Sequence, residues 1–322
     1  MHIVTGGAGF IGSAVVWRLN NLGIEDIIVV DNLNTSEKWK NLVNLRYADY
    51  LHRDAFMSLV QNDSLGNRIK AVIHMGACSS TMERDADFLM RNNLEYSKIL
   101  YLFAKAKKAR FINASSAATY GDGSRGFIDD KDTLHTLRPL NMYGYSKHLF
   151  DMWALKNRHL DDMVSLKFFN VYGPNEQHKG DMRSVVNKAF HQIRETGVMR
   201  LFRSTDPAFA DGGQMRDFIY VKDCVNIIVW FLQNNVCGIF NAGSGKARTW
   251  NDLAAAVFAA MELPANIEYV DMPPHLQGKY QNFTEADTRR LSAAGCNSPM
   301  YSLKQGVSDY VRHYLLRSNP HL

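Results

Sequence analysis

The chain has 322 residues, of which 46% are hydrophobic and 21% are charged. This composition is ordinary for a folded globular protein, and the length suits a large α/β unit with a smaller second lobe. No apolar run reaches the ~20 residues of a membrane-spanning helix, and the chain enters a predicted strand at once, which leaves no room for a signal peptide. We therefore expect a cytoplasmic protein with no membrane partner.

The net charge of +5 is modest, and no motif supports a nucleic-acid partner. The densest basic run, 105–110, ends a predicted helix, where cations offset the helix dipole. A cationic pocket for a small anionic ligand explains the excess charge equally well. The four cysteines lack Cys-x-x-Cys spacing and the eleven histidines include no His-Glu-x-x-His, so we expect reduced thiols and no metal.

Strand and helix patterns alternate through the first half of the chain, which favours a parallel sheet covered on both faces. The predicted strands there are 1–5, 26–31, 44–48, 70–75, 110–114 and 164–169, and the predicted helices are 10–21, 53–62, 84–107 and 143–158. The second half is predicted to contain helices near 182–195, 222–233, 249–261 and 303–317, with strands near 199–203, 217–221 and 238–242. The stretch 204–216, with one proline and two glycines, is predicted to be a long loop.

A glycine-rich turn follows the first predicted strand. Residues 5–12 read Thr-Gly-Gly-Ala-Gly-Phe-Ile-Gly and open a helix. Such a turn presents unpaired backbone N–H groups to a diphosphate, and glycine lets the backbone approach the phosphates closely. The second strand ends in Asp31, about 20 residues on, where a carboxylate contacts an adenosine ribose in dinucleotide-binding proteins. A structural glycine turn is the alternative, but the context favours a bound dinucleotide.

Three further side chains form a candidate redox centre. Tyr143 and Lys147 lie four residues apart on a predicted helix and therefore share a face. The lysine cation stabilises a phenolate, so the pair is suited to proton transfer once the tyrosine pKa falls from ~10. Ser116 follows a predicted strand at the end where α/β sheets bind ligands. Each alone has a plainer explanation, a core tyrosine with a solvated lysine and a turn serine, but all occur together in workable order.

With these motifs the chain resembles the extended short-chain dehydrogenase/reductase family over essentially its whole length. The resemblance implies an α/β fold: a Rossmann-type doubly wound parallel sheet with a smaller C-terminal substrate-binding lobe. The expected boundaries are 1–169 plus 217–245 for the nucleotide-binding domain and 170–216 plus 246–322 for the lobe. Tyr143 would be the acid/base, Lys147 would bind the nicotinamide ribose and lower the tyrosine pKa, and Ser116 would orient the reacting oxygen.

Several stretches resemble more closely one branch of the family, the enzymes that invert C6 of an ADP-linked heptose for the lipopolysaccharide core. These stretches are 77–81, 114–121, 141–147, 169–174, 178–180 and 278–281. The His-Lys-Gly segment 178–180 discriminates best, because 4-epimerases and dehydratases do not usually carry it. Ala117 and Ala118 stand where dehydratases usually place an Asp-Glu pair. The resemblance and the chemistry together make Lys179 a second proton-transfer group, with a solvated loop lysine as the alternative.

The resemblance implies NADP as the cofactor, although Asp31 alone is typical of NAD, since a carboxylate repels a 2′-phosphate. Lys38 and Arg53 could neutralise that phosphate, and NAD stays the alternative. The implied cofactor-binding residues are Gly6, Gly9, Phe10, Ile11, Gly12, Asp31, Asn32, Lys38, Arg53, His74, Met75, Gly76, Ala77, Cys78, Ser79, Asn92, Lys147, Val171 and Lys179. The implied substrate-binding residues are Ser116, Asn170, Asp181, Lys188, Phe202, Arg203, Ser204, Thr205, Arg216 and Tyr280.

Two features depart from the pattern of that branch. Asp181 and Lys188 stand where other polar residues are expected, and the 206–215 loop is longer, so the nucleotide-sugar pocket is less firmly predicted than the redox centre. Alternative functions are another nucleotide-sugar epimerase or reductase, or a non-catalytic NADP-binding regulator. The resemblance also implies a homo-oligomer, in particular a homopentamer.

Overall fold

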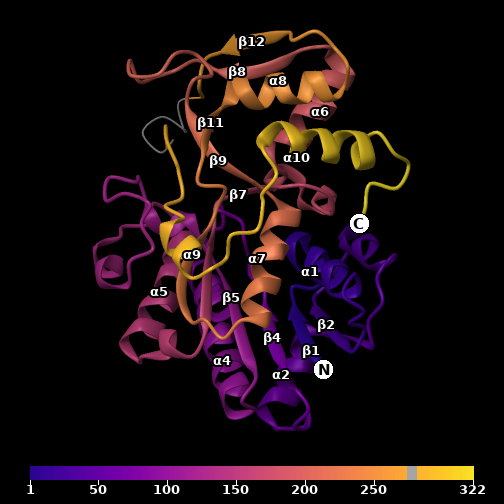
Figure 1. Cartoon of the computed structure of the whole chain (residues 1–322), viewed down its shortest axis with the longest axis vertical. Helices are drawn as coiled ribbons and strands as arrows, with labels where there is room; N and C mark the ends of the chain where they lie inside the picture. The colour runs from indigo at the N-terminus through magenta and orange to yellow at the C-terminus, as the bar shows by residue number, and fades with distance from the viewer. Residues whose placement is uncertain (274–280) are drawn as a thin grey trace.

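The computed structural model describes residues 1–273 and 281–322. Its core is a seven-stranded sheet in the order β10-β6-β5-β4-β1-β2-β3, and every neighbouring pair is parallel (Figure 1). The strands are β1 (His2–Thr5), β2 (Ile27–Asp31), β3 (Asp49–His52), β4 (Ala71–His74), β5 (Arg110–Ser116), β6 (Val164–Phe168) and β10 (Gly238–Ala242). The predicted doubly wound α/β fold is confirmed.

Helices cover both faces of this sheet because its strands alternate apolar side chains from one face to the other. The helices of this part are α1 (Phe10–Asn20), α2 (Arg53–Gln61), α3 (Ala86–Leu89), α4 (Tyr96–Ala106), α5 (Met142–Lys156) and α7 (Val221–Gln233). In β1, Val4 packs in one core with α1 and α7, whereas Ile3 packs in a second core with α2, α4 and α5. Each core is fully closed to solvent at these strand positions.

Two small sheets build the rest of the chain (Figure 1). β7 (Asn170–Tyr172), β9 (Met215–Tyr220) and β11 (Ala247–Thr249) form one, and β8 (Met199–Phe202) pairs with β12 (Ile267–Val270) in the other. The helices here are α6 (Val185–Thr196), α8 (Trp250–Ala260), α9 (Arg289–Ala293) and α10 (Leu303–Tyr310). The strands predicted near 217–221 and 238–242 therefore exist as β9 and β10, but only β10 extends the main sheet. The proposed domain boundaries stay a prediction.

The order of the main sheet reverses between β4 and β1, which is where open α/β sheets bind ligands. The last residues of β1, β2, β4 and β5 are Thr5, Asp31, His74 and Ser116. Parallel strands bring these carboxyl ends to one edge, so the predicted motifs converge there. In the part of the chain that the structure describes, no helix is both long and apolar enough to span a membrane.

Candidate active site

The glycine turn packs tightly against the loop that follows β4. Gly6 has φ +64°, and a Cβ there would lie 2.7 Å from the backbone of Gly76. A Cβ at Gly12 would lie 2.0 Å from the Gly6 carbonyl oxygen, so α1 can start this close to the turn only with glycine. Gly9 caps α1 without a side-chain hydrogen bond, which leaves the first N–H groups of the helix for an anion.

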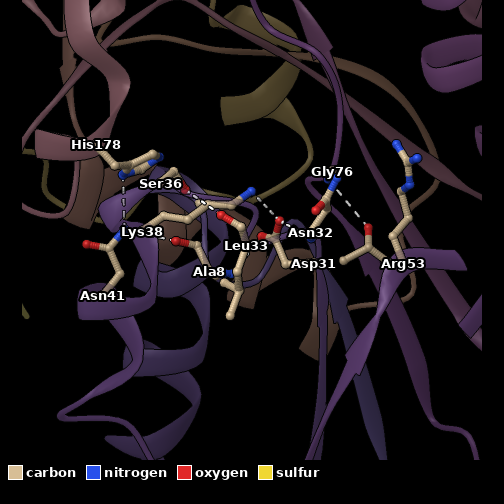
Figure 2. A network of polar contacts seen from close by, with 12 residues as sticks. Ala8, Asp31, Asn32, Leu33, Ser36, Lys38, Asn41, Arg53, Gly76 and His178 are labelled. Carbon is tan, nitrogen blue, oxygen red and sulfur yellow. Dashed lines mark hydrogen bonds and ion pairs between the residues drawn. The ribbon is translucent and has the colours of Figure 1, made fainter. Parts of the chain in front are cut away.

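Asp31 is held between the glycine turn and a lysine (Figure 2). Its Oδ2 accepts a hydrogen bond from the Ala8 N–H at 2.9 Å, and its Oδ1 accepts from the Asn32 N–H at 2.7 Å and from Lys38 Nζ at 2.6 Å. The side chains of Asp31 and Lys38 are 7% and 19% exposed, so this pair is largely shielded from water. The Asp31 carboxylate, which would otherwise repel a ribose 2′-phosphate, is thus neutralised by Lys38 within the protein.

A cavity of about 270 Å³ opens beside this pair, and Asp31, Asn32, Lys38, Arg53, Cys78 and Asn92 are among its lining residues. Arg53 Nη1 donates to Asn92 Oδ1 at 2.6 Å. Asn92 lies in a π-helical turn, η2 (Met90–Glu95), where sequence periodicity had indicated one continuous helix. Single π turns of this kind often occur at functional sites because they re-aim side chains.

The same π turn contributes a residue that the sequence analysis missed. Asn93 is fully buried; its Nδ2 donates to the Cys78 carbonyl at 2.9 Å and to Ser146 Oγ at 3.0 Å, and its Oδ1 accepts from the Cys78 N–H at 2.9 Å. Asn93 therefore fixes the backbone of the cavity wall to α5. Tyr96, which also lines the cavity, was missed too. The only sequence signal for either was an asparagine pair inside an amphipathic helix.

A second cavity of about 480 Å³ adjoins the first and shares Gly6, Asp31, Lys38 and Gly76 with it. Together the two form one cleft along the carboxyl edge of the sheet. Apart from His74, every predicted cofactor-binding residue lines this cleft, as do Ser116 and Tyr143.

His74 is the exception, and its side chain has a different role from the predicted one. The imidazole is 1% exposed, with Nδ1 2.6 Å from Thr5 Oγ1 and Nε2 2.8 Å from Ser97 Oγ. Burial lowers the His74 pKa to about 3, so the ring is neutral. The His74 side chain therefore links the end of β4 to β1 and α4, and the residues that line the cleft here are Gly76 and Ala77 instead.

Ser116, Tyr143 and Lys147 meet because α5 approaches the end of β5 closely. A Cβ at Gly144 would lie 2.7 Å from the Ala118 carbonyl oxygen, so this close approach requires glycine between Tyr143 and Lys147. The Ser116 hydroxyl lies close enough to the Tyr143 phenol to lower its pKa. Lys147 Nζ donates to the Ala114 carbonyl at 2.7 Å.

The electrostatics of this group differ from the sequence expectation. Burial raises the pKa of Tyr143, and the hydrogen bond from Ser116 lowers it by less. Burial lowers the pKa of Lys147 to about 8, while the Asp151 carboxylate opposes that fall. Lys147 is not among the groups that shift the Tyr143 pKa here, so the expected lowering by Lys147 together with an oxidised nicotinamide stays a prediction for the cofactor-bound protein.

Lys179 reaches the same cavity from a different segment, the 3-10 turn η6 (Gln177–Met182). Its Nζ lies 5.3 Å from the centre of the Phe10 ring, at the start of α1. Burial lowers the Lys179 pKa, and Glu176 opposes this effect. The neighbouring His178 has its Nδ1 3.3 Å from Asn41 Nδ2 (Figure 2), and Asn41 Nδ2 also donates to the Ala8 carbonyl at 2.9 Å. Asn41 thus links the segment that carries Lys179 to the glycine turn.

Only some of the predicted substrate-binding residues lie together in one cavity. Lys188 and Phe202 line a cavity of about 470 Å³ with Trp250, and the Arg216 guanidinium lies 5.6 Å from the Trp250 ring. Trp250 was missed by the sequence analysis, which had no signal for it. Tyr280 lies outside the described residues.

The other predicted substrate residues either bond to neighbouring residues or are exposed. Asn170 Nδ2 donates to the Asp217 carbonyl at 3.2 Å, and the Ser204 N–H donates to Asp211 Oδ1 at 2.8 Å. Arg203 lies 3.4 Å from Asp211, whereas Asp181 and Thr205 are exposed. The structure therefore brings all the residues of the predicted redox centre to one cavity and those of the predicted nucleotide-sugar site only partly together.

Comparisons with known proteins agree with this architecture. The model of the NAD dependent epimerase/dehydratase family matches residues 2–243. The chain is similar to the ADP-L-glycero-D-manno-heptose-6-epimerase of Nitratidesulfovibrio vulgaris, with 65% identity over 100% of both chains. It is 47% identical to the enzyme of that name from Fusobacterium nucleatum, again over 100% of both chains.

Among solved structures, the Helicobacter pylori ADP-L-glycero-D-manno-heptose-6-epimerase superposes with a TM-score of 0.82 at 27% identity, covering 97% of this chain and 95% of that chain. The match of the family model spans the main sheet, the glycine turn and the Tyr-x-x-x-Lys helix. The identities to the two bacterial relatives extend over the smaller lobe as well. This chain belongs to the NAD dependent epimerase/dehydratase family.

Proposed function

We propose that this chain inverts C6 of ADP-D-glycero-β-D-manno-heptose, giving the L-glycero epimer, by transient oxidation to a 6-ketone with bound NADP. The observation that carries the proposal is the joint placement of Tyr143, Ser116 and Lys179 in one cavity at the carboxyl edge of the sheet. The names of the full-length relatives support the choice of sugar. The step belongs to the synthesis of a heptose precursor of lipopolysaccharide.

The residues present fit a pyridine dinucleotide. Gly6 and Gly12 leave room for a diphosphate where a Cβ would meet the backbone, and α1 directs its free N–H groups to the same place. Lys147 lies where it can hold the nicotinamide ribose. When bound, the nicotinamide accepts a hydride from C6 and returns it to the opposite face.

Two proton-transfer groups are the simplest solution for this epimerisation, because the C6 oxygen occupies two positions relative to one hydride donor. Tyr143 can exchange a proton with that oxygen in one position, while Ser116 donates a hydrogen bond that orients it. Lys179 can exchange a proton in the other position, since burial lowers its pKa toward the working range. The two groups come from α5 and η6, which approach the cavity on separate segments.

NADP is supported by the charge balance around Asp31. The carboxylate is already paired with Lys38, and Arg53 lines the same cavity. A 2′-phosphate would therefore meet two cations whose own carboxylates are already paired, Lys38 with Asp31 and Arg53 with the exposed Asp54, and the planar guanidinium suits phosphate oxygens. Identifying by mass the nucleotide released from the denatured protein tests this choice against NAD.

The smaller lobe supplies groups suited to ADP. Arg216 and Lys188 can bind diphosphate oxygens, and Trp250 and Phe202 offer aromatic surface for a base. We also infer a cytoplasmic homo-oligomer, in particular a homopentamer, from the family resemblance. Light scattering tests the oligomeric state.

The test of the reaction is incubation with ADP-D-glycero-β-D-manno-heptose, with the C6 configuration followed by NMR. We expect conversion without added cofactor, because the hydride is returned, and no solvent deuterium at C6 in heavy water. Fixed deuterium at C6 would end the hydride mechanism. Stoichiometric consumption of NADPH would instead indicate a reductase, and an unchanged cellular role of the Tyr143→Phe variant would indicate a non-catalytic regulator.

A further inference from the structure

Directly behind the redox centre lies a fully buried ion pair that the reaction does not use. Lys167 on β6 and Asp151 on α5 are both 0% exposed, and Nζ lies 3.2 Å from Oδ2. Removing two charges from water costs free energy that their attraction alone often does not recover. A buried pair of this kind, one strand away from a catalytic serine, therefore calls for a function beyond stability.

Each member of the pair reaches one side of Ser116. On one side, Asp151 Oδ2 accepts a hydrogen bond from Ser115 Oγ at 2.6 Å. On the other, Lys167 Nζ donates to Thr119 Oγ1 at 2.5 Å, and Thr119 Oγ1 donates to the Ser116 carbonyl at 2.8 Å. The residue before Ser116 and the main chain of Ser116 itself are thus tied to the same two charges.

Two further contacts fix the pair in place. Asp151 Oδ1 accepts from Ser165 Oγ at 2.8 Å, and Lys167 Nζ lies 4.8 Å from the centre of the Tyr120 ring. Asp151 also lies one helical turn beyond Lys147 on α5, so the carboxylate faces the same strand end as the catalytic lysine. Every hydrogen-bonding group of the carboxylate is therefore directed at β5 or β6.

We propose that the Asp151–Lys167 pair is a positioning unit that holds the Ser116 hydroxyl in place for the reacting oxygen and for Tyr143. This rests on the proposed function, in which Ser116 orients the substrate oxygen. Neither member of the pair lines the cleft, and the pair acts through β5 and the turn η3 (Ala117–Tyr120) that follows it. Displacing a positioned catalytic group by about 1 Å can reduce turnover about 10²-fold.

The experiment removes both charges while keeping the side-chain shapes, in the double variant Asp151→Asn/Lys167→Met. Neutral replacement of both partners of a buried pair is usually tolerated, whereas loss of one leaves an unpaired charge. Asp223→Asn serves as the control, because Asp223 is a buried carboxylate on α7 that accepts a hydrogen bond from the Tyr301 N–H, remote from the redox centre. We expect kcat for C6 epimerisation to fall about tenfold or more in the double variant. Because the Asp151 carboxylate also raises the Lys147 pKa, the variant Ser115→Ala/Thr119→Val, which keeps both charges, is measured beside it.

Coupling to Ser116 separates positioning from a general structural effect. If the pair acts through Ser116, the double variant should lose little further activity in a Ser116→Ala background, because neighbouring groups that act as a unit are not additive. The proposal is overturned if the losses of kcat from the double variant and from Ser116→Ala are fully additive, or if kcat is unchanged in the folded double variant. Should the double variant not fold, Ser115→Ala/Thr119→Val cuts both links to Ser116 without touching the charges, and the same outcomes decide.

A second readout does not depend on the reaction. The Ala118 N–H donates to Ser116 Oγ at 3.1 Å, so hydrogen exchange of residues 114–121 reports the order of this turn. We expect faster exchange there in the double variant and not in Asp223→Asn. If the unmodified chain does not epimerise the heptose, the proposed function fails, while unchanged exchange at 114–121 overturns the positioning role separately.

Discussion

Replacing Lys38 with methionine should change the preference of the chain between NADP and NAD. Lys38 Nζ lies 2.6 Å from Asp31 Oδ1, and the substitution keeps the aliphatic stem while removing the charge. Asp31 retains its hydrogen bonds from the Ala8 and Asn32 N–H groups, so the glycine turn keeps its conformation. What changes is the charge: the carboxylate then faces a 2′-phosphate without its counter-ion.

The magnitude follows from the loss of one hydrogen bond to a charged group, worth about 1.5–3 kcal/mol. Because 1.4 kcal/mol corresponds to tenfold in affinity, NADP binding should weaken about 10- to 150-fold. NAD lacks the phosphate, so its dissociation constant should change by no more than about threefold. The free energy of unfolding should fall somewhat, because Asp31 is only 7% exposed and loses its counter-ion, so urea unfolding is measured alongside to show that the variant is folded.

Titration calorimetry of nucleotide-free protein measures both dissociation constants. Lys40→Met is the matched control, because Lys40 lies in the same 3-10 turn, η1 (Glu37–Leu42), but is 47% exposed and paired with Glu37. We expect both constants to be unaffected in that control. An equal loss of NADP and NAD affinity in Lys38→Met, or no loss of either, would refute the assignment of Lys38 to the 2′-phosphate.

Three other predictions concern the reaction and the turn. Tyr143→Phe and Lys179→Met should each slow epimerisation, measured by NMR, at least ~10²-fold with cofactor still bound. The control Tyr145→Phe, at an exposed position, should not slow it, and near-normal turnover of Lys179→Met would remove Lys179 from the mechanism. The Lys147 pKa is lowered to about 8, so its cation is present below that pH and lost above it. The kcat should therefore fall as pH rises through about 8, and Lys147→Arg should move the fall to higher pH; an unchanged pH profile in that variant would refute a role for the Lys147 cation. Gly6→Ala should abolish cofactor retention and lower the free energy of unfolding, measured in urea, by more than the ~1–2 kcal/mol of left-handed backbone strain. The control Gly23→Ala has φ +74° but no atom within 4 Å of the new Cβ, so it should show only that strain. Equal losses in the two variants would mean that the contact of residue 6 with Gly76 is unimportant.

The local motifs of this chain were readable from sequence because neighbouring residues decide them. The glycine turn, the acidic end of the second strand and the four-residue spacing of Tyr143 and Lys147 each depend on the backbone conformation of a few consecutive residues. The buried strands were equally clear, since β2, β4 and β6 are apolar runs covered on both faces.

Elements whose definition depends on a distant partner were missed or misplaced. The predicted strand 44–48 is in fact β3 at Asp49–His52, an edge strand whose half-exposed side chains carry no apolar pattern and whose register is set by pairing with β2. The strands β7, β11 and β12 were missed because each has only three or four residues and forms only beside another strand. The π turn in the predicted helix 84–107 follows from the side-chain contacts of Asn93, which periodicity does not reveal.

The sequence alone thus determined the glycine turn at the carboxyl edge of the sheet and the shared helix face of Tyr143 and Lys147, because their geometry is set within one turn or one helix. Only the tertiary structure decided that Lys38 neutralises Asp31, that Asn93 ties the cavity wall to α5, and that a buried ion pair stands behind Ser116. These arrangements join segments far apart along the chain. They form only when the sheet order and the packing of helices on it bring those segments together, and no local pattern encodes that order.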